Sequence, residues 1–178
     1  HGIKTKGTER DQPAISKRSR DTADGMSKGV KFLLKKNKID EIQGNGKILA
    51  TQKVEVTNKN NAKKIVETKN ILIATGARAK ELPNLKIDGK SVIGYREALV
   101  LSKIPKTMVI VGSGAIGSEF AYFYQSLGTE VTLVEFMPAI LPIEDEDVSK
   151  QLTKSFQKMG MKIKVNRSEE HTSELQSR

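Results

Sequence analysis

Residues 108–111 form a short apolar run, Met-Val-Ile-Val, and Gly-Ser-Gly-Ala-Ile-Gly follows at once at residues 112–117. The length and β-branching of the run are typical of a buried parallel strand. A helical pattern then continues to Leu127 and is closed by Gly128. A glycine motif of this form is weak evidence alone, but between a strand and a helix it predicts a dinucleotide-binding β-α-β unit.

Each glycine of the motif has a physical task in such a unit. Gly112 makes the tight turn out of the strand, and Gly114 leaves room for a pyrophosphate beside the backbone. Gly117 lets the helix lie close to the sheet, and the helix N-terminus offers free N–H groups to the phosphates. The alternative is a turn whose glycines serve packing alone.

An acidic residue stands where the nucleotide ribose is expected. Glu135 follows the predicted strand 131–134, 18 residues after Gly117. A carboxylate there can accept hydrogen bonds from both ribose hydroxyls, and its charge repels the 2′-phosphate of NADP. Phe136 and Met137 come next, with no arginine, so NAD is preferred to NADP. The alternative is an ordinary surface glutamate.

Residues 138–165 extend the same alternation. The acidic cluster at residues 144–147 favours a helix N-terminus, apolar residues at helical spacing continue to Met159, and Gly160 ends the helix. Residues 161–165 are predicted to form a third strand. Residues 106–166 therefore predict a Rossmann-type β-α-β-α-β half.

The first half of the chain has a different pattern. A helix is predicted from Ala14 to about Asn37, followed by a switch to period two. The expected strands are residues 47–56, 63–68 and a buried apolar strand at 70–74; a hairpin turn is expected at 58–61, a loop at 83–94 and a helical turn at 95–101. This half predicts a helix followed by a β-hairpin or meander.

Composition excludes several classes of protein. The chain has no cysteine, which rules out a disulfide scaffold and thiol chemistry by these residues, and two histidines make a metal site unexpected. No apolar run is long enough to span a membrane and no signal peptide is evident, so a cytoplasmic location is expected. The net charge of +10 falls mostly on residues 1–69. A nucleic-acid partner is the alternative to a solvated lysine-rich surface, but no aromatic residues are interleaved with the lysines.

Residues 167–178 do not continue the pattern. They read RSEEHTSELQSR, with one large aliphatic residue and no apolar stripe. We expect a non-native, adapter-like tail, or else a disordered polar tail, and exclude it from functional reasoning.

The glycine motif and the earlier Thr-Gly-Ala at residues 75–77 together carry a family resemblance. From about residue 2 to 165 the chain resembles the FAD- and NAD-dependent pyridine nucleotide–disulfide oxidoreductases, and among them the dihydrolipoyl dehydrogenases. Specific stretches are ILIATGARAKELP and MVIVGSGAIGSEFAYFYQSLGTEVTLVEFMPAILP. The resemblance implies an α/β, partial two-dinucleotide-domain fold, with residues 1–105 in an FAD-binding domain and 106–166 in an NAD-binding domain.

The resemblance also implies which residues bind the cofactors. For NAD they are Gly112, Ser113, Gly114, Ala115, Ile116, Gly117, Ser118, Glu119 and Glu135, with Glu119 near the nicotinamide and flavin. For FAD they are Gly46, Thr75, Gly76 and Ala77.

Family features are also missing from the sequence. It has neither the family's first FAD glycine fingerprint nor its CxxxxC redox pair, and Ala79 stands where proline is common. We therefore expect a central fragment without catalytic residues of its own, inactive alone.

The resemblance implies that the whole enzyme oxidises dihydrolipoamide with NAD, through FAD and a redox disulfide. Its partners would be the lipoyl-bearing acyltransferase of 2-oxoacid dehydrogenase complexes or the glycine-cleavage carrier protein, and it would be a homodimer. Two alternatives stay open. One is a stand-alone NAD-binding module; the other is a related disulfide reductase such as glutathione or mercuric reductase, against which Glu135 argues because those enzymes use NADP.

Overall fold

The computed structural model describes residue 7, residues 9–79 and residues 82–167. The chain divides into two compact units, described here separately. Ser19–Arg78 forms one unit, and the described parts of His1–Arg18 and Ala79–Arg178 form the other. The segment 167–178, predicted to be an adapter-like tail, lies outside the described residues except for Arg167.

Helix α1 spans Gln12–Lys36, close to the predicted helix. It begins there because the Asp11 carboxylate accepts a hydrogen bond from the Ala14 N–H at 2.9 Å, which caps the first turn. Lys35 and Lys36 in the last turn complement the negative end of the helix dipole. Most of its large apolar side chains are exposed, among them Met26 at 70% and Phe32 at 65%.

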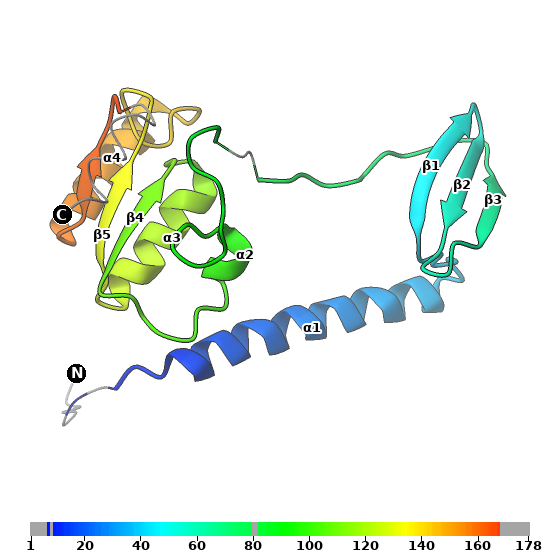
Figure 1. Cartoon of the computed structure of the whole chain (residues 1–178), viewed down its shortest axis with the longest axis horizontal. Helices are drawn as coiled ribbons and strands as arrows, with labels where there is room; N and C mark the ends of the chain where they lie inside the picture. Colours follow the sequence, from blue (N-terminus) through cyan, green and yellow to red (C-terminus); the bar gives the residue numbers. More distant parts are fainter. Residues whose placement is uncertain (1–6, 8, 80–81, 168–178) are drawn as a thin grey trace. The chain divides into compact units, whose positions relative to one another are not determined.

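The unit Ser19–Arg78 holds an antiparallel sheet of β1 (Asn45–Ala50), β2 (Lys53–Thr57) and β3 (Lys63–Glu67) in that order (Figure 1). The predicted single strand 47–56 is wrong, because the chain reverses at Gln52, which has a φ of 67°. The predicted turn at 58–61 is confirmed. The Asn58 side chain accepts hydrogen bonds from the N–H groups of Asn60 and Ala62.

The predicted buried strand at residues 70–74 is also wrong. The segment is irregular, and Leu72 and Ile73 are 92% and 69% exposed. A strand needs a neighbouring strand for its backbone hydrogen bonds, and none of the strands in the described residues pairs with this run.

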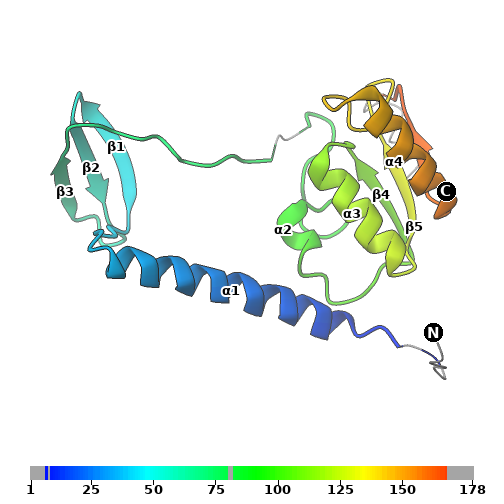
Figure 2. The ribbon, with the colours of Figure 1, turned by 180° about the vertical axis from the view of Figure 1, so that it is seen from behind.

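The second unit contains the predicted β-α-β-α-β arrangement. Strands β4 (Thr107–Val111), β5 (Glu130–Val134) and β6 (Lys162–Lys164) are parallel, in the order β4-β5-β6. Helices α3 (Ala115–Ser126) and α4 (Glu146–Lys158) connect them and lie on one face of the sheet (Figure 2). The expected helical turn before β4 is confirmed as α2 (Tyr95–Ala98).

The core of this unit lies between the sheet and the helices. Val131 and Leu133 of β5 are fully buried, as are Ala121 and Tyr124 of α3, and Phe156 of α4 is 3% exposed. The Gln125 side chain ties α3 to the end of α4 by donating to the Met159 carbonyl at 2.9 Å.

Strand β4 is less buried than its sequence predicts. Val109 and Val111 alternate with Met108 and Ile110, and the first two are 40% and 37% exposed. Met108 and Ile110 pack against the core on the face that α3 and α4 cover (Figure 2), whereas Val109 and Val111 point to the opposite face.

Candidate dinucleotide-binding site

The glycine motif forms the junction between β4 and α3. The Gly112 N–H donates to the Val134 carbonyl at 2.8 Å, and Gly112 has a φ of +94°, a left-handed conformation that favours glycine. Helix α3 starts three residues later, with Gly114 at its N-cap and no side chain capping it. The predicted tight turn out of the strand is confirmed.

The other two glycines of the motif have opposite surroundings. A Cβ on Gly117 would lie 1.9 Å from the Gly112 carbonyl oxygen, so the predicted close approach of helix and strand at Gly117 is confirmed. A Cβ on Gly114 would meet no atom within 4 Å. Gly114 therefore borders open space at the start of α3.

This open space suits a phosphate group. The first N–H groups of an α-helix have no partner within the helix, and here no cap side chain takes their place. With the positive end of the helix dipole they form an anion-binding position. Gly114, Ala115 and Ile116 are exposed at this end, so the residues present fit the pyrophosphate of a dinucleotide.

Glu135 lies against the same turn. It follows β5 directly and is only 8% exposed. Its Oε2 accepts hydrogen bonds from the Ser113 N–H at 2.8 Å and from the Ser113 Oγ at 2.6 Å. Its Oε1 accepts one from the Met137 N–H at 2.9 Å. The structure thus brings together the glycine turn and Glu135, which the sequence predicts to bind the pyrophosphate and the ribose.

These contacts keep the buried carboxylate ionised. Burial raises the pKa of Glu135, but the hydrogen bonds from Met137 and Ser113, together with the Phe136 backbone, outweigh it and hold the pKa below its ordinary value. A charged side chain at this position repels a 2′-phosphate.

The predicted NAD residues differ in accessibility. Ser113 is fully buried and Ser118 is 6% exposed, whereas Glu119 is exposed on α3. The Ser118 Oγ donates to the Ser113 carbonyl at 2.9 Å. The two serines therefore line the inside of the turn, while Gly114 and Glu119 face solvent.

Sequence reasoning missed a contact between the glycine turn and the connection after Glu135. The Leu141 N–H donates to the Ser113 carbonyl at 3.1 Å, and the Ser149 Oγ donates to the Leu141 carbonyl at 3.1 Å. Leu141 has a φ of 48°. Pro138 and Pro142 signalled a loop here, but nothing in the sequence signalled its contact with the glycine turn.

The residues predicted to contact FAD all lie in the other unit. Gly46 is opposite Val56 in the β1–β2 pair, and Thr75, Gly76 and Ala77 follow β3 in the irregular segment. All four are exposed, and Gly76 has a φ of +73°. Their backbone groups are accessible to a ligand, which is compatible with the expected role.

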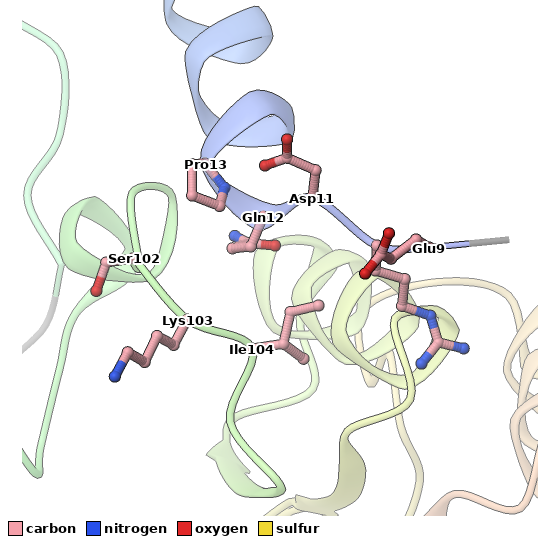
Figure 3. Close-up of a pocket in the computed structure, with 8 residues that line it drawn as sticks. Glu9, Asp11, Gln12, Pro13, Ser102, Lys103 and Ile104 are labelled. Carbon is pink, nitrogen blue, oxygen red and sulfur yellow. The ribbon is translucent and has the colours of Figure 1, made fainter.

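A separate hollow of about 520 Å³ lies between the start of α1 and the segment before β4 (Figure 3). It contains none of the predicted site residues. Gln12, which is 4% exposed, joins its two sides, because its Nε2 donates to the Leu101 carbonyl at 3.3 Å. Its role in the structure is to hold the start of α1 against this segment.

Two other findings concern the described residues alone. They contain no group of three or more His, Asp or Glu side chains placed to hold a metal ion. Among their helices, none is both long enough and apolar enough to cross a membrane.

The fold and the site define a class: an α/β protein with the strand, glycine turn and helix of a dinucleotide-binding unit. The family model described as pyridine nucleotide-disulphide oxidoreductase matches residues 2–177. The chain belongs to this family, as its sequence predicted, and the family uses FAD and NAD.

Similarity to individual proteins supports the same family membership. A dihydrolipoyl dehydrogenase of Zymomonas mobilis is 44% identical over 163 residues, which are 92% of this chain and 35% of that protein. A leghemoglobin reductase of Vigna unguiculata is 38% identical over 93% of this chain and 32% of its own length. The chain therefore spans about a third of the relatives it matches.

Solved structures agree on the fold. The crystal structure of LpdA from Mycobacterium tuberculosis matches with a TM-score of 0.82 and 28% identity, over 90% of this chain and 36% of that one. A cysteine-to-serine mutant of the flavoprotein disulfide reductase RclA of Escherichia coli matches with a TM-score of 0.74 and 26% identity, over 89% of this chain and 36% of that one. The predicted partial two-dinucleotide-domain fold is confirmed.

Proposed function

We propose that this chain supplies the NAD site, in the first half of the NAD-binding domain, and part of the FAD site of a dihydrolipoyl dehydrogenase. In this proposal residues 106–166 hold NAD and residues 1–105 belong to the FAD-binding domain. Such an enzyme oxidises dihydrolipoamide carried on the acyltransferase of a 2-oxoacid dehydrogenase complex or on a glycine-cleavage carrier protein, and acts as a homodimer. The identity of 44% with the Zymomonas protein favours this assignment.

One observation carries the proposal: an ionised carboxylate bonded to a glycine turn whose helix N-terminus has no cap. The open N–H groups bind the pyrophosphate, and Glu135 accepts a hydrogen bond from the adenosine ribose. Both features are what a dinucleotide requires.

The chain's residues bind and orient, and the cofactors carry the redox chemistry. Bound FAD and NAD supply the electron and hydride transfer. The exposed turn at Gly114–Ile116 holds the phosphates, and Gly112, Gly117, Ser113 and Ser118 build its rigid interior. Glu119 is exposed on the first turns of α3, and in this proposal it faces the nicotinamide. The exposed backbone at Gly46 and at residues 75–77 contacts FAD.

We propose that the chain has no activity alone. It contains no cysteine, so no redox disulfide can form from its residues. A second candidate, a stand-alone NAD-binding module, is favoured by the separate core of the unit that holds all the NAD residues. A related disulfide reductase is the third, favoured by the likeness to RclA. A cytoplasmic location and the absence of a nucleic-acid partner stay predictions; similar proteins of Pisum sativum and Dictyostelium discoideum are named mitochondrial.

Two measurements test the proposal. Calorimetric titration of the 178-residue chain with NAD and with NADP should show saturable NAD binding and weaker NADP binding. Equal affinity for the two nucleotides would contradict the assigned role of Glu135. A spectrophotometric assay of NAD reduction by dihydrolipoamide, with FAD added, should show no turnover. Turnover by the chain alone would contradict the proposed inactivity.

A further inference from the structure

We propose that Ser113 is a positioning residue for the ribose site. Its hydroxyl fixes Oε2 of the Glu135 carboxylate so that Oε1 faces a ribose hydroxyl. The inference rests on the proposed NAD-binding function, and it assigns Ser113 a role through Glu135 instead of direct contact with the cofactor.

The burial of Ser113 favours the role through Glu135 over direct contact with the cofactor. Ser113 is fully buried, so its side chain cannot touch a nucleotide bound outside the turn. Its Oγ lies 2.6 Å from Glu135 Oε2, and its N–H lies 2.8 Å from the same oxygen. Hydrogen bonds to a carboxylate are short and strong, so this pair holds Oε2 from two directions.

A count of acceptor positions gives the consequence for binding. A carboxylate offers about four lone-pair positions, two on each oxygen. Ser113 fills both on Oε2, and the Met137 N–H fills one on Oε1. Oε1 is therefore the less occupied oxygen, although the Phe136 backbone also lies against the carboxylate, and it is the oxygen on which Glu135 accepts a ribose hydroxyl in this arrangement.

Ser113 is itself fixed in place. Its carbonyl accepts a hydrogen bond from the Ser118 Oγ at 2.9 Å and another from the Leu141 N–H at 3.1 Å. These bonds come from α3 and from the connection after Glu135. The residue whose hydroxyl holds the carboxylate is therefore itself held by hydrogen bonds from two elements.

The groups around Glu135 lower the pKa of its carboxyl group by hydrogen bonding. Lys164 and Arg167 adjoin it through their backbones, since the Glu135 N–H donates to the Lys164 carbonyl and the Arg167 N–H donates to the Glu135 carbonyl. Within the described part of the chain, no charged side chain contributes to the lowered pKa of Glu135. Removing the Ser113 hydroxyl thus removes one of the few groups that favour the ionised form.

The test compares S113A with S149A. Ser149 is 4% exposed and its Oγ donates to the backbone carbonyl of Leu141, so S149A also loses a buried hydroxyl but not a contact with Glu135. The pKa of Glu135 is measured in the nucleotide-free chain from its side-chain carboxyl ¹³C shift, assigned with E135Q. We expect S113A alone to raise this pKa. The NMR spectra also report whether each variant folds.

Calorimetry then gives the effect on the nucleotide. S113A should bind NAD about tenfold more weakly than wild type, with a larger loss at pH 5 than at pH 8, and should discriminate less between NAD and NADP. An unchanged pKa of Glu135, or equal effects of S113A and S149A on the pKa and the discrimination, would overturn the inference. If wild type bound no NAD, both the proposed function and the role of Ser113 in ribose binding would be wrong. A rise in the pKa of Glu135 in S113A alone would even then show that Ser113 positions the carboxylate.

Discussion

The carbonyl oxygen of Gly112 lies so close to Gly117 that a Cβ on Gly117 would be only 1.9 Å from it. The last glycine of the motif is thus in close contact with the first. At Gly117 the space between α3 and β4 has no room for a side chain. Gly114, between them, has a φ of −61° and open space around it. The three glycines of one motif therefore have different reasons to be glycine.

Gly117→Ala should destabilise the unit that contains α3. The added methyl overlaps a backbone atom, which cannot rotate away, so the helix must shift from the strand. We expect a loss of at least about 2 kcal/mol in the free energy of unfolding, measured by urea denaturation. Gly114→Ala is the matched control and should lower the urea midpoint much less, because its methyl group meets no atom and only the preference of an N-cap for glycine over alanine is lost. Equal destabilisation by both substitutions would contradict this account of the turn.

Gly25→Ala and Gly29→Ala should stabilise α1. Both glycines lie inside the helix, and a Cβ on either meets no atom within 4 Å. Alanine is favoured over glycine in a helix interior by about 1 kcal/mol per residue. Circular dichroism at 222 nm should show more helix in the double variant. Gly76→Ala, at a φ of +73°, is a contrasting change that adds no helix; loss of helix in the double variant would contradict the expectation.

Glu135 should make folding depend on pH. Its pKa is lowered in the folded chain, so its contribution to stability is present above the unfolded value, about 4.3, and is lost as the pH falls through the folded value. Glu135→Gln lacks this contribution at every pH. The difference in unfolding free energy between wild type and the variant should therefore shrink between pH 7 and pH 3, in urea titrations at each pH. A difference that stayed constant would show that ionisation of Glu135 does not matter to the fold.

The second unit was predictable because its signals are local. The β-branched run at residues 108–111, the glycines that end α3 and α4, and the acidic start of α4 each specify their element without distant partners. Gly128 and Gly160 both have a positive φ, +91° and +83°, as helix-ending glycines commonly do. The Asp145 side chain caps α4 by accepting a hydrogen bond from the Asp147 N–H.

The failures concern features that depend on partners or on single turn residues. The run at 70–74 has the composition of a buried strand, but composition cannot supply a neighbouring strand. The turn at Gln52 has a left-handed backbone conformation, and glutamine is not a residue type that predicts one. The sequence placed Glu135 near the glycine motif, yet its hydrogen bonds to Ser113 depend on how β5 aligns with β4, which no local pattern encodes.

The most direct test of the central claim, that the turn at residues 112–117 binds the NAD phosphates, is to compare NAD binding by wild type and Gly114→Ala. The substitution adds a methyl group only on the open side of the turn, where the pyrophosphate would lie. The account predicts that the variant still folds, with a cooperative urea transition, and binds NAD at least about tenfold more weakly in calorimetry. Unchanged NAD affinity in a folded variant would contradict it.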